Sequence, residues 1–170
     1  MILTIDQQIE RMAELWPGWT VTRLSGQGAE WSGTLQPNRT EYQLRVRYRV
    51  PELLLNLTAL QAQPRVYVDR PALQEKPGNP EGRIPHVYWP VSDPNGQPSL
   101  CLFDLEAREW GSGEYIADTT IPWSALWLNW YEGWLITGKW LGSGRHARRS
   151  ADGRREPKRL EDEAVERNAA

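Results

Sequence analysis

The chain is poor in several residue types from which common functional sites are built. It holds one cysteine, one phenylalanine, two methionines and two histidines among 170 residues. A single cysteine excludes an intrachain disulfide framework, and His86 and His146 stand too far apart to suggest a metal site. The sequence therefore predicts no disulfide, no metal and no cofactor.

An excess of one charge and a long apolar run are also missing. Lys and Arg number 20 against 22 Asp and Glu, a net charge of -2, which disfavours a basic nucleic-acid-binding domain. No apolar run reaches the roughly 20 residues that span a membrane. Residues 1–10 include Asp6 and Glu10 but no basic residue, unlike a secretory signal. We expect a cytoplasmic protein with no membrane partner.

Tryptophan and a charged C-terminal stretch are the abundant features. Five of the ten tryptophans fall between Trp123 and Trp140. Residues 145–170 carry 8 basic and 6 acidic residues with almost nothing apolar, which is typical of a disordered tail. We expect a folded domain over residues 1–144 and a charged tail over residues 145–170. This tail is either simply solvated or contacts an acidic surface or nucleic acid.

The periodicity of the first 70 residues predicts one helix followed by strands. Apolar residues recur at helical spacing from Ile5 to Trp16, and Thr4 with Gln7 fits a capping box. Strands are expected at residues 19–24, 29–35, 42–50 and 66–68, with the strictest alternation over 42–50. This order predicts an α+β fold with an N-terminal helix and a four-stranded antiparallel meander.

An irregular segment and a tryptophan-rich helix are expected to follow. Seven prolines within residues 69–99 forbid a long helix or a central strand, so we expect an ordered, irregular connection. A helix should start at Thr119-Thr120, because threonine caps helices well and Pro122 is tolerated in the first turn, and it should run to about residue 137 and stop at Gly138. Most of its tryptophans should be core, but we expect Trp134 and Trp140 to stay exposed for a partner.

Cys101 is the one candidate thiol nucleophile. It follows the long irregular segment, and functional residues concentrate on such loops. The alternative is a small buried core residue, because free cysteine is among the most buried residue types and Leu100 and Leu102 flank it.

A series of short motifs surrounds this cysteine. In order they are His86-Val87-Tyr88, Gly96, Leu100-Cys101-Leu102, Trp110 and Thr120-Ile121. The series resembles the active-site block of ubiquitin-conjugating enzymes, the UBC fold, over residues 1–141. The tryptophan-rich stretch further resembles the stand-alone ubiquitin-conjugating-like proteins of type II, short CBASS antiphage operons. The resemblance implies that the C-terminal helices of the UBC fold are truncated here.

The resemblance also implies a mechanism and a partner. Cys101 would hold the C-terminus of a cGAS/DncV-like nucleotidyltransferase as a thioester and then transfer it to an amine or release it by hydrolysis. A separate activating enzyme would be a further partner. His86, the second candidate site residue, matches the family's motif histidine, and it either fixes the loop or acts as a base.

Departures from the family pattern keep other functions open. Val87 and Tyr88 replace the usual Pro and Asn, so the usual oxyanion side chain is missing. Asn95 could substitute for it, or could simply be a turn residue. The alternatives are a non-catalytic binding protein of the same fold, which would regulate the same partner, and a cysteine hydrolase.

Overall fold

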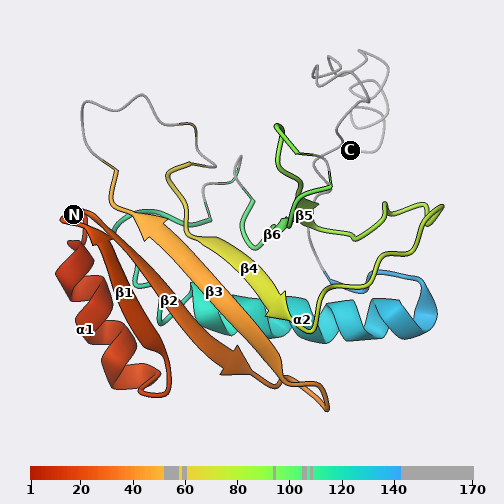
Figure 1. The fold of residues 1–170 in the computed structure, drawn as a ribbon, viewed down its shortest axis with the longest axis horizontal. Helices are drawn as coiled ribbons and strands as arrows, with labels where there is room; N and C mark the ends of the chain where they lie inside the picture. The colour runs from red at the N-terminus through yellow and green to blue at the C-terminus, as the bar shows by residue number, and fades with distance from the viewer. Residues whose placement is uncertain (52–57, 59–60, 94, 105–106, 108, 143–170) are drawn as a thin grey trace, which may run out of the picture.

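The computed structural model describes residues 1–51, 58, 61–93, 95–104, 107 and 109–142 (Figure 1). A helix, a four-stranded antiparallel sheet in the order β1-β2-β3-β4, a two-stranded pair and a second helix follow in turn. This arrangement confirms the predicted α+β, UBC-like layout. The tail predicted at 145–170 lies outside the described residues. The elements are α1 (Ile5–Leu15), β1 (Thr20–Ser25), β2 (Gly28–Leu35), β3 (Tyr42–Arg49), β4 (Arg65–Arg70), β5 (Val87–Tyr88), β6 (Ser99–Leu100) and α2 (Thr120–Thr137).

Helix α1 begins with the predicted capping box and is fixed to the chain by a buried glutamine. The Gln7 backbone N–H donates to Thr4 Oγ1 at 3.2 Å, and the Thr4 backbone N–H donates to Gln7 Oε1 at 2.9 Å. Gln8 is fully buried; its Nε2 donates to the Glu114 carbonyl at 2.8 Å and its Oε1 accepts from Ile116 N–H at 2.9 Å. One side chain thus satisfies two backbone groups of the segment that precedes α2.

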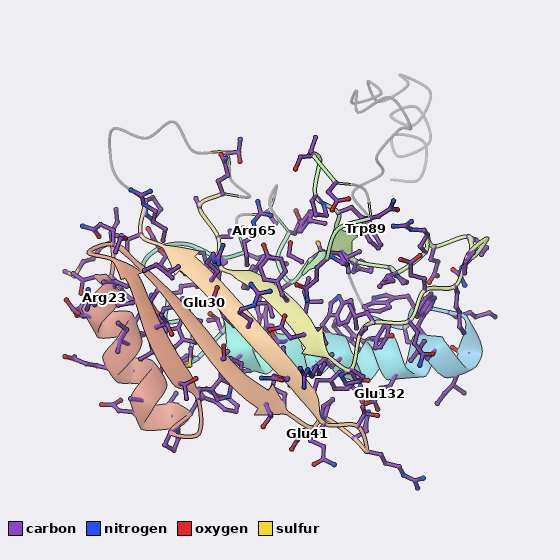
Figure 2. All side chains as sticks on the ribbon, in the orientation of Figure 1. Arg23, Glu30, Glu41, Arg65, Trp89 and Glu132 are labelled. Carbon is purple, nitrogen blue, oxygen red and sulfur yellow. The ribbon has the colours of Figure 1, made fainter. Side chains whose placement is uncertain are left out.

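The sheet separates an apolar inner face from a charged outer face. β3 alternates buried and more exposed residues along its length, and Trp31, Val46 and Val66 align across three strands of the inner face. On the outer face Arg47 Nε donates to Glu30 at 3.0 Å (Figure 2 labels Glu30). Position 33 must be glycine, because a Cβ there would run into the ring of Trp19.

Helix α2 packs behind the sheet and extends past its β4 edge (Figure 1). Tyr42 of β3 meets Tyr131 of α2 edge to face, with ring centroids 6.5 Å apart. The expectation that Trp134 and Trp140 stay exposed is wrong, because they are only 0% and 9% exposed. Such large apolar rings gain the most from leaving water, so the protein buries them. Among the described residues of α2 and the segment after it, up to residue 142, the large hydrophobic side chains that stay exposed are Leu126, Ile136 and Leu141.

The two ends of α2 agree with the sequence to different degrees. Gly138 ends the helix in the left-handed conformation, with φ 73°, as predicted. The helix begins at Thr120 with Thr119 as its N-cap residue, which confirms the predicted start, but the Thr119 side chain makes no capping hydrogen bond. Thr119 Oγ1 instead accepts from Trp110 Nε1 at 3.1 Å and donates to the Tyr115 carbonyl at 2.8 Å, so it is already engaged.

The proline-rich connection is ordered where it meets the end of α2, as predicted. Lys76 Nζ donates to the carbonyls of Trp134 at 3.1 Å and Leu135 at 2.6 Å. Asn79 Nδ2 donates to the Gly138 carbonyl at 3.1 Å. These donors supply hydrogen bonds to carbonyls of the last turn and the C-cap, although the Trp134 carbonyl also accepts from Gly138 N–H at 2.8 Å. The ammonium charge lies at the negative end of the helix dipole.

Replacing Gln8 by alanine should strongly destabilise the fold. The substitution leaves the Glu114 carbonyl and the Ile116 N–H without their partners, and each buried unsatisfied group costs about 1–3 kcal/mol. Urea unfolding should give a free energy of unfolding lower by about 2–4 kcal/mol. The matched control is Gln7→Ala, which removes only an exposed capping contact and should cost about 0.5–1 kcal/mol. Equal losses in the two variants would contradict the bridging role of Gln8.

Candidate active site

Cys101 lies at the end of a short antiparallel pair. Val87 pairs with Leu100 and Tyr88 with Ser99, and Cys101 N–H donates to the His86 carbonyl at 2.9 Å to extend the pair. The pairing is the reason that the irregular segment holds its cysteine in a defined place. Cys101 itself is half-buried, whereas its neighbour Leu100 is only 4% exposed.

Tyr88 contacts the sulfur of Cys101 directly. The Tyr88 hydroxyl and Cys101 Sγ are 3.0 Å apart and are joined by a hydrogen bond. The register explains the contact, because the two residues are diagonal neighbours on one face of the pair, within reach of an aromatic side chain. The sequence analysis missed this residue. It noted only that Tyr88 replaces the usual asparagine of the family motif, because the pairing register is not visible in the sequence.

His86 connects the cysteine segment to helix α2. Its carbonyl accepts from Cys101 N–H and from Trp127 Nε1, both at 2.9 Å. Its backbone adopts φ 50°, an uncommon conformation for a residue other than glycine, and its ring stacks on Trp140 with centroids 5.0 Å apart. These contacts support a structural role for His86, and a role as a base stays a prediction.

The structure places Asn95 in a tight turn. Its backbone N–H donates to Asp93 Oδ1 at 3.1 Å, and Gly96 N–H donates to the Asp93 carbonyl at 2.9 Å. The Asn95 side chain is exposed. This geometry agrees with a turn residue, and a role for Asn95 at an oxyanion stays a prediction.

Comparison with known proteins places the chain in a family. The family model of the type II CBASS E2 proteins matches residues 8–147. The chain belongs to this family. It is therefore an E2-like protein of CBASS, as the motifs around Cys101 and the tryptophan-rich stretch together predict. A search of the curated proteins finds no match to the chain.

Among the described residues, no helix is long and apolar enough to cross a bilayer. Within the same part of this E2-like chain, no group of three or more His, Cys, Asp or Glu side chains is placed to hold a metal ion.

The surroundings of the thiol oppose its ionisation. Burial raises the pKa of Cys101, and the negative charges of Asp104 and Glu109 raise it further, whereas the hydrogen bond from Tyr88 lowers it. Burial likewise raises the pKa of Tyr88 well above its usual range, so the phenol stays protonated at neutral pH. In this E2-like protein a half-buried thiol therefore contacts a neutral hydroxyl and lies within the influence of two carboxylate charges.

Replacing Asp104 by asparagine should make the thiol more reactive. Asn keeps an oxygen for the Ala107 N–H, which Asp104 Oδ1 accepts at 3.1 Å, but it removes the negative charge that disfavours the thiolate. The pKa of Cys101 should fall, so alkylation by iodoacetamide at pH 7.5 should become about two- to tenfold faster. Glu109→Gln should act in the same direction but less strongly.

Glu10→Gln, on the exposed face of α1, is the matched control and should leave the alkylation rate unchanged. A rate in Asp104→Asn no higher than in Glu10→Gln would show that Asp104 does not act on the thiol.

Proposed function

We propose that this protein is a carrier enzyme that holds the C-terminus of a cGAS/DncV-like nucleotidyltransferase on Cys101 as a thioester in antiviral defence. The observation that carries the proposal is the position of Cys101: the residue is half-buried, its Sγ is hydrogen-bonded to the Tyr88 hydroxyl at 3.0 Å, and its N–H donates to the His86 carbonyl. A cysteine that served only as core would lie fully among apolar side chains.

The chemistry needs an activated acyl group, which a separate activating enzyme would supply as its own thioester. The Cys101 thiolate attacks the acyl carbon, a carbon–sulfur bond forms, and the activating enzyme's thiolate leaves with the electron pair. An amine then attacks the new thioester to give an amide, or water attacks it to give the free carboxylate; Cys101 leaves as thiolate in either case. The reducing cytoplasm would keep the single thiol free for this cycle.

The exposed apolar face of α2 supports a protein partner. An open cleft of about 480 Å³ lies between the helix and the β2–β3 connection, and Trp130, Ile136 and Leu141 line it together with polar residues such as Asn38. Ile136 and Leu141 are 86% and 72% exposed. Exposed apolar residues gathered in this way are typical of a protein interface.

A non-catalytic binding protein is the second candidate. The raised pKa of Cys101 favours it, because a thiol that resists ionisation is a poor nucleophile at neutral pH. The two candidates differ in whether Cys101 acquires a covalent adduct.

Intact mass under non-reducing conditions should detect the thioester. The protein is purified from cells that also express the partner nucleotidyltransferase and the activating enzyme, as wild type, Cys101→Ala and Cys101→Ser. A thioester gives the summed mass less one water and is cleaved by neutral hydroxylamine, whereas a disulfide gives the sum less two hydrogens and resists hydroxylamine. We expect the first adduct in the wild type and none in Cys101→Ala. Any such adduct on this chain maps to Cys101, its single cysteine.

Cys101→Ser should trap an oxygen ester that resists thiols. A thiol-resistant adduct in the wild type that still requires Cys101 would indicate amide transfer. The carrier function would be refuted by the absence of any adduct in the wild type when wild type and Cys101→Ala bind the partner equally well.

Replacing Ile136 by aspartate should weaken partner binding without unfolding the protein. The side chain is 86% exposed, so the fold loses little, whereas a charge within an apolar interface should weaken binding at least about tenfold. Titration calorimetry with the nucleotidyltransferase measures the change. Leu24→Asp is the matched control, since Leu24 is 51% exposed on β1, at the sheet edge opposite β4. Equal affinity of Ile136→Asp and wild type would place the interface elsewhere.

A further inference from the structure

The contact between Tyr88 and Cys101 places a hydrogen-bond donor at the reacting atom. The two side chains lie on the same face of the β5–β6 pair, and their hydroxyl and sulfur are 3.0 Å apart. The pair is anchored at the core, since Leu100 is 4% and Ser99 1% exposed. The phenol has only two side-chain torsions to fix, so little freedom is lost when it points at the sulfur.

The direction of this hydrogen bond depends on the state of the thiol. While Cys101 is protonated, its S–H donates to the phenol oxygen. Once the thiol ionises, the phenol O–H becomes the donor and the thiolate the acceptor. The phenol keeps its proton throughout, because burial raises the pKa of Tyr88. The donor is therefore available whenever the nucleophile is present.

The carboxylates around the sulfur cannot replace this donor. Asp104 and Glu109 act on Cys101 through their negative charges, and ionised carboxylates only accept hydrogen bonds. Arg65 of β4 acts on Tyr88 through its positive charge, so it is the alternative donor that the test must address. His86 contacts Cys101 through its backbone carbonyl, which accepts from Cys101 N–H and is therefore again an acceptor.

We propose that Tyr88 is a catalytic residue that donates its O–H first to the Cys101 thiolate and then to the oxyanion of the tetrahedral intermediate. This inference rests on the proposed carrier function of Cys101. When the thiolate attacks the acyl carbon, the carbon–sulfur bond forms, the carbonyl π bond breaks, and the negative charge moves from sulfur to oxygen. Both atoms are bonded to the same carbon, so a donor beside the sulfur reaches the oxygen by a small rotation.

When the tetrahedral intermediate collapses, the negative charge leaves the oxygen and the Tyr88 hydrogen bond leaves with it. The carbonyl re-forms, the leaving thiolate of the activating enzyme departs with its electron pair, and the phenol returns to a neutral thioester sulfur. In the transfer step an amine attacks, the same oxyanion forms, and Cys101 leaves as a thiolate that again accepts from Tyr88. The attacking amine loses its proton to water. Tyr88 keeps its own proton throughout, so it stabilises charge without acting as a base.

The test is Tyr88→Phe, which removes one oxygen and keeps the ring. Two quantities are measured on the full chain: the pH midpoint of iodoacetamide alkylation, and the single-turnover rate of thioester formation on the high-pH plateau, where the thiol is ionised in every variant. We expect the midpoint to rise by about one pH unit, since the thiolate loses its donor. We expect the plateau rate to fall about 10²-fold, because the oxyanion loses its donor as well.

Tyr48→Phe is the matched control. The Tyr48 hydroxyl is buried and makes no hydrogen bond, and its ring packs on Trp110. Its removal should change neither quantity. Arg65→Gln, measured in the same way, shows whether the arginine and not Tyr88 is the donor.

The outcomes separate the two proposals. If the wild type forms the thioester and Tyr88→Phe has an unchanged plateau rate, the role of Tyr88 is overturned and the carrier function stands. The same holds if the rate falls in Arg65→Gln but not in Tyr88→Phe. A raised midpoint with an unchanged plateau rate limits Tyr88 to the thiolate and overturns its role at the oxyanion. Absence of a thioester in the wild type overturns the carrier function itself, and the role of Tyr88 with it.

Discussion

The carbonyl oxygen of His86 is the point on which the candidate site depends. It accepts one hydrogen bond from Cys101 N–H and another from Trp127 Nε1, so it joins the cysteine segment to helix α2. An acceptor can satisfy two donors only if both approach its lone pairs, and the left-handed backbone of His86 directs the oxygen accordingly. The position of the thiol therefore follows from the packing of the tryptophan-rich helix, and not from the short β5–β6 pair alone.

Much of the fold could be predicted from local patterns. The capping box of α1, the alternation of β3 and the glycine that ends α2 each depend on residues close in sequence, and the structure confirms all three. Contacts between distant residues could not be predicted in this way. The burial of Trp140 against His86 arises only when segments far apart in sequence meet. The contact of Thr119 with Trp110, nine residues away, also lies outside the first helical turn that a capping rule considers.

In the candidate site, too, local motifs could be predicted from the sequence and contacts across strands could not. The motifs pointed to Cys101 and His86, and the family match agrees with the resemblance that these motifs carry. Tyr88 was overlooked because its contact with Cys101 depends on a strand register, and a shift of one residue would turn its side chain to the other face. Residue identity showed only that the usual side chain was missing; the three-dimensional arrangement shows which group stands beside the sulfur.

The cap that Lys76 forms on helix α2 has a consequence for the chemistry of the whole chain. Its ammonium group is committed to the carbonyls of Trp134 and Leu135 and is therefore a poor amine nucleophile. Lysines are scarce besides: of the 20 basic residues three are lysine, at positions 76, 139 and 158, and the other 17 are arginine, whose guanidinium stays protonated and does not attack an acyl group. An acyl group on Cys101 would thus find few acceptors on its own carrier. In the transfer step the attacking amine would therefore come mainly from another molecule.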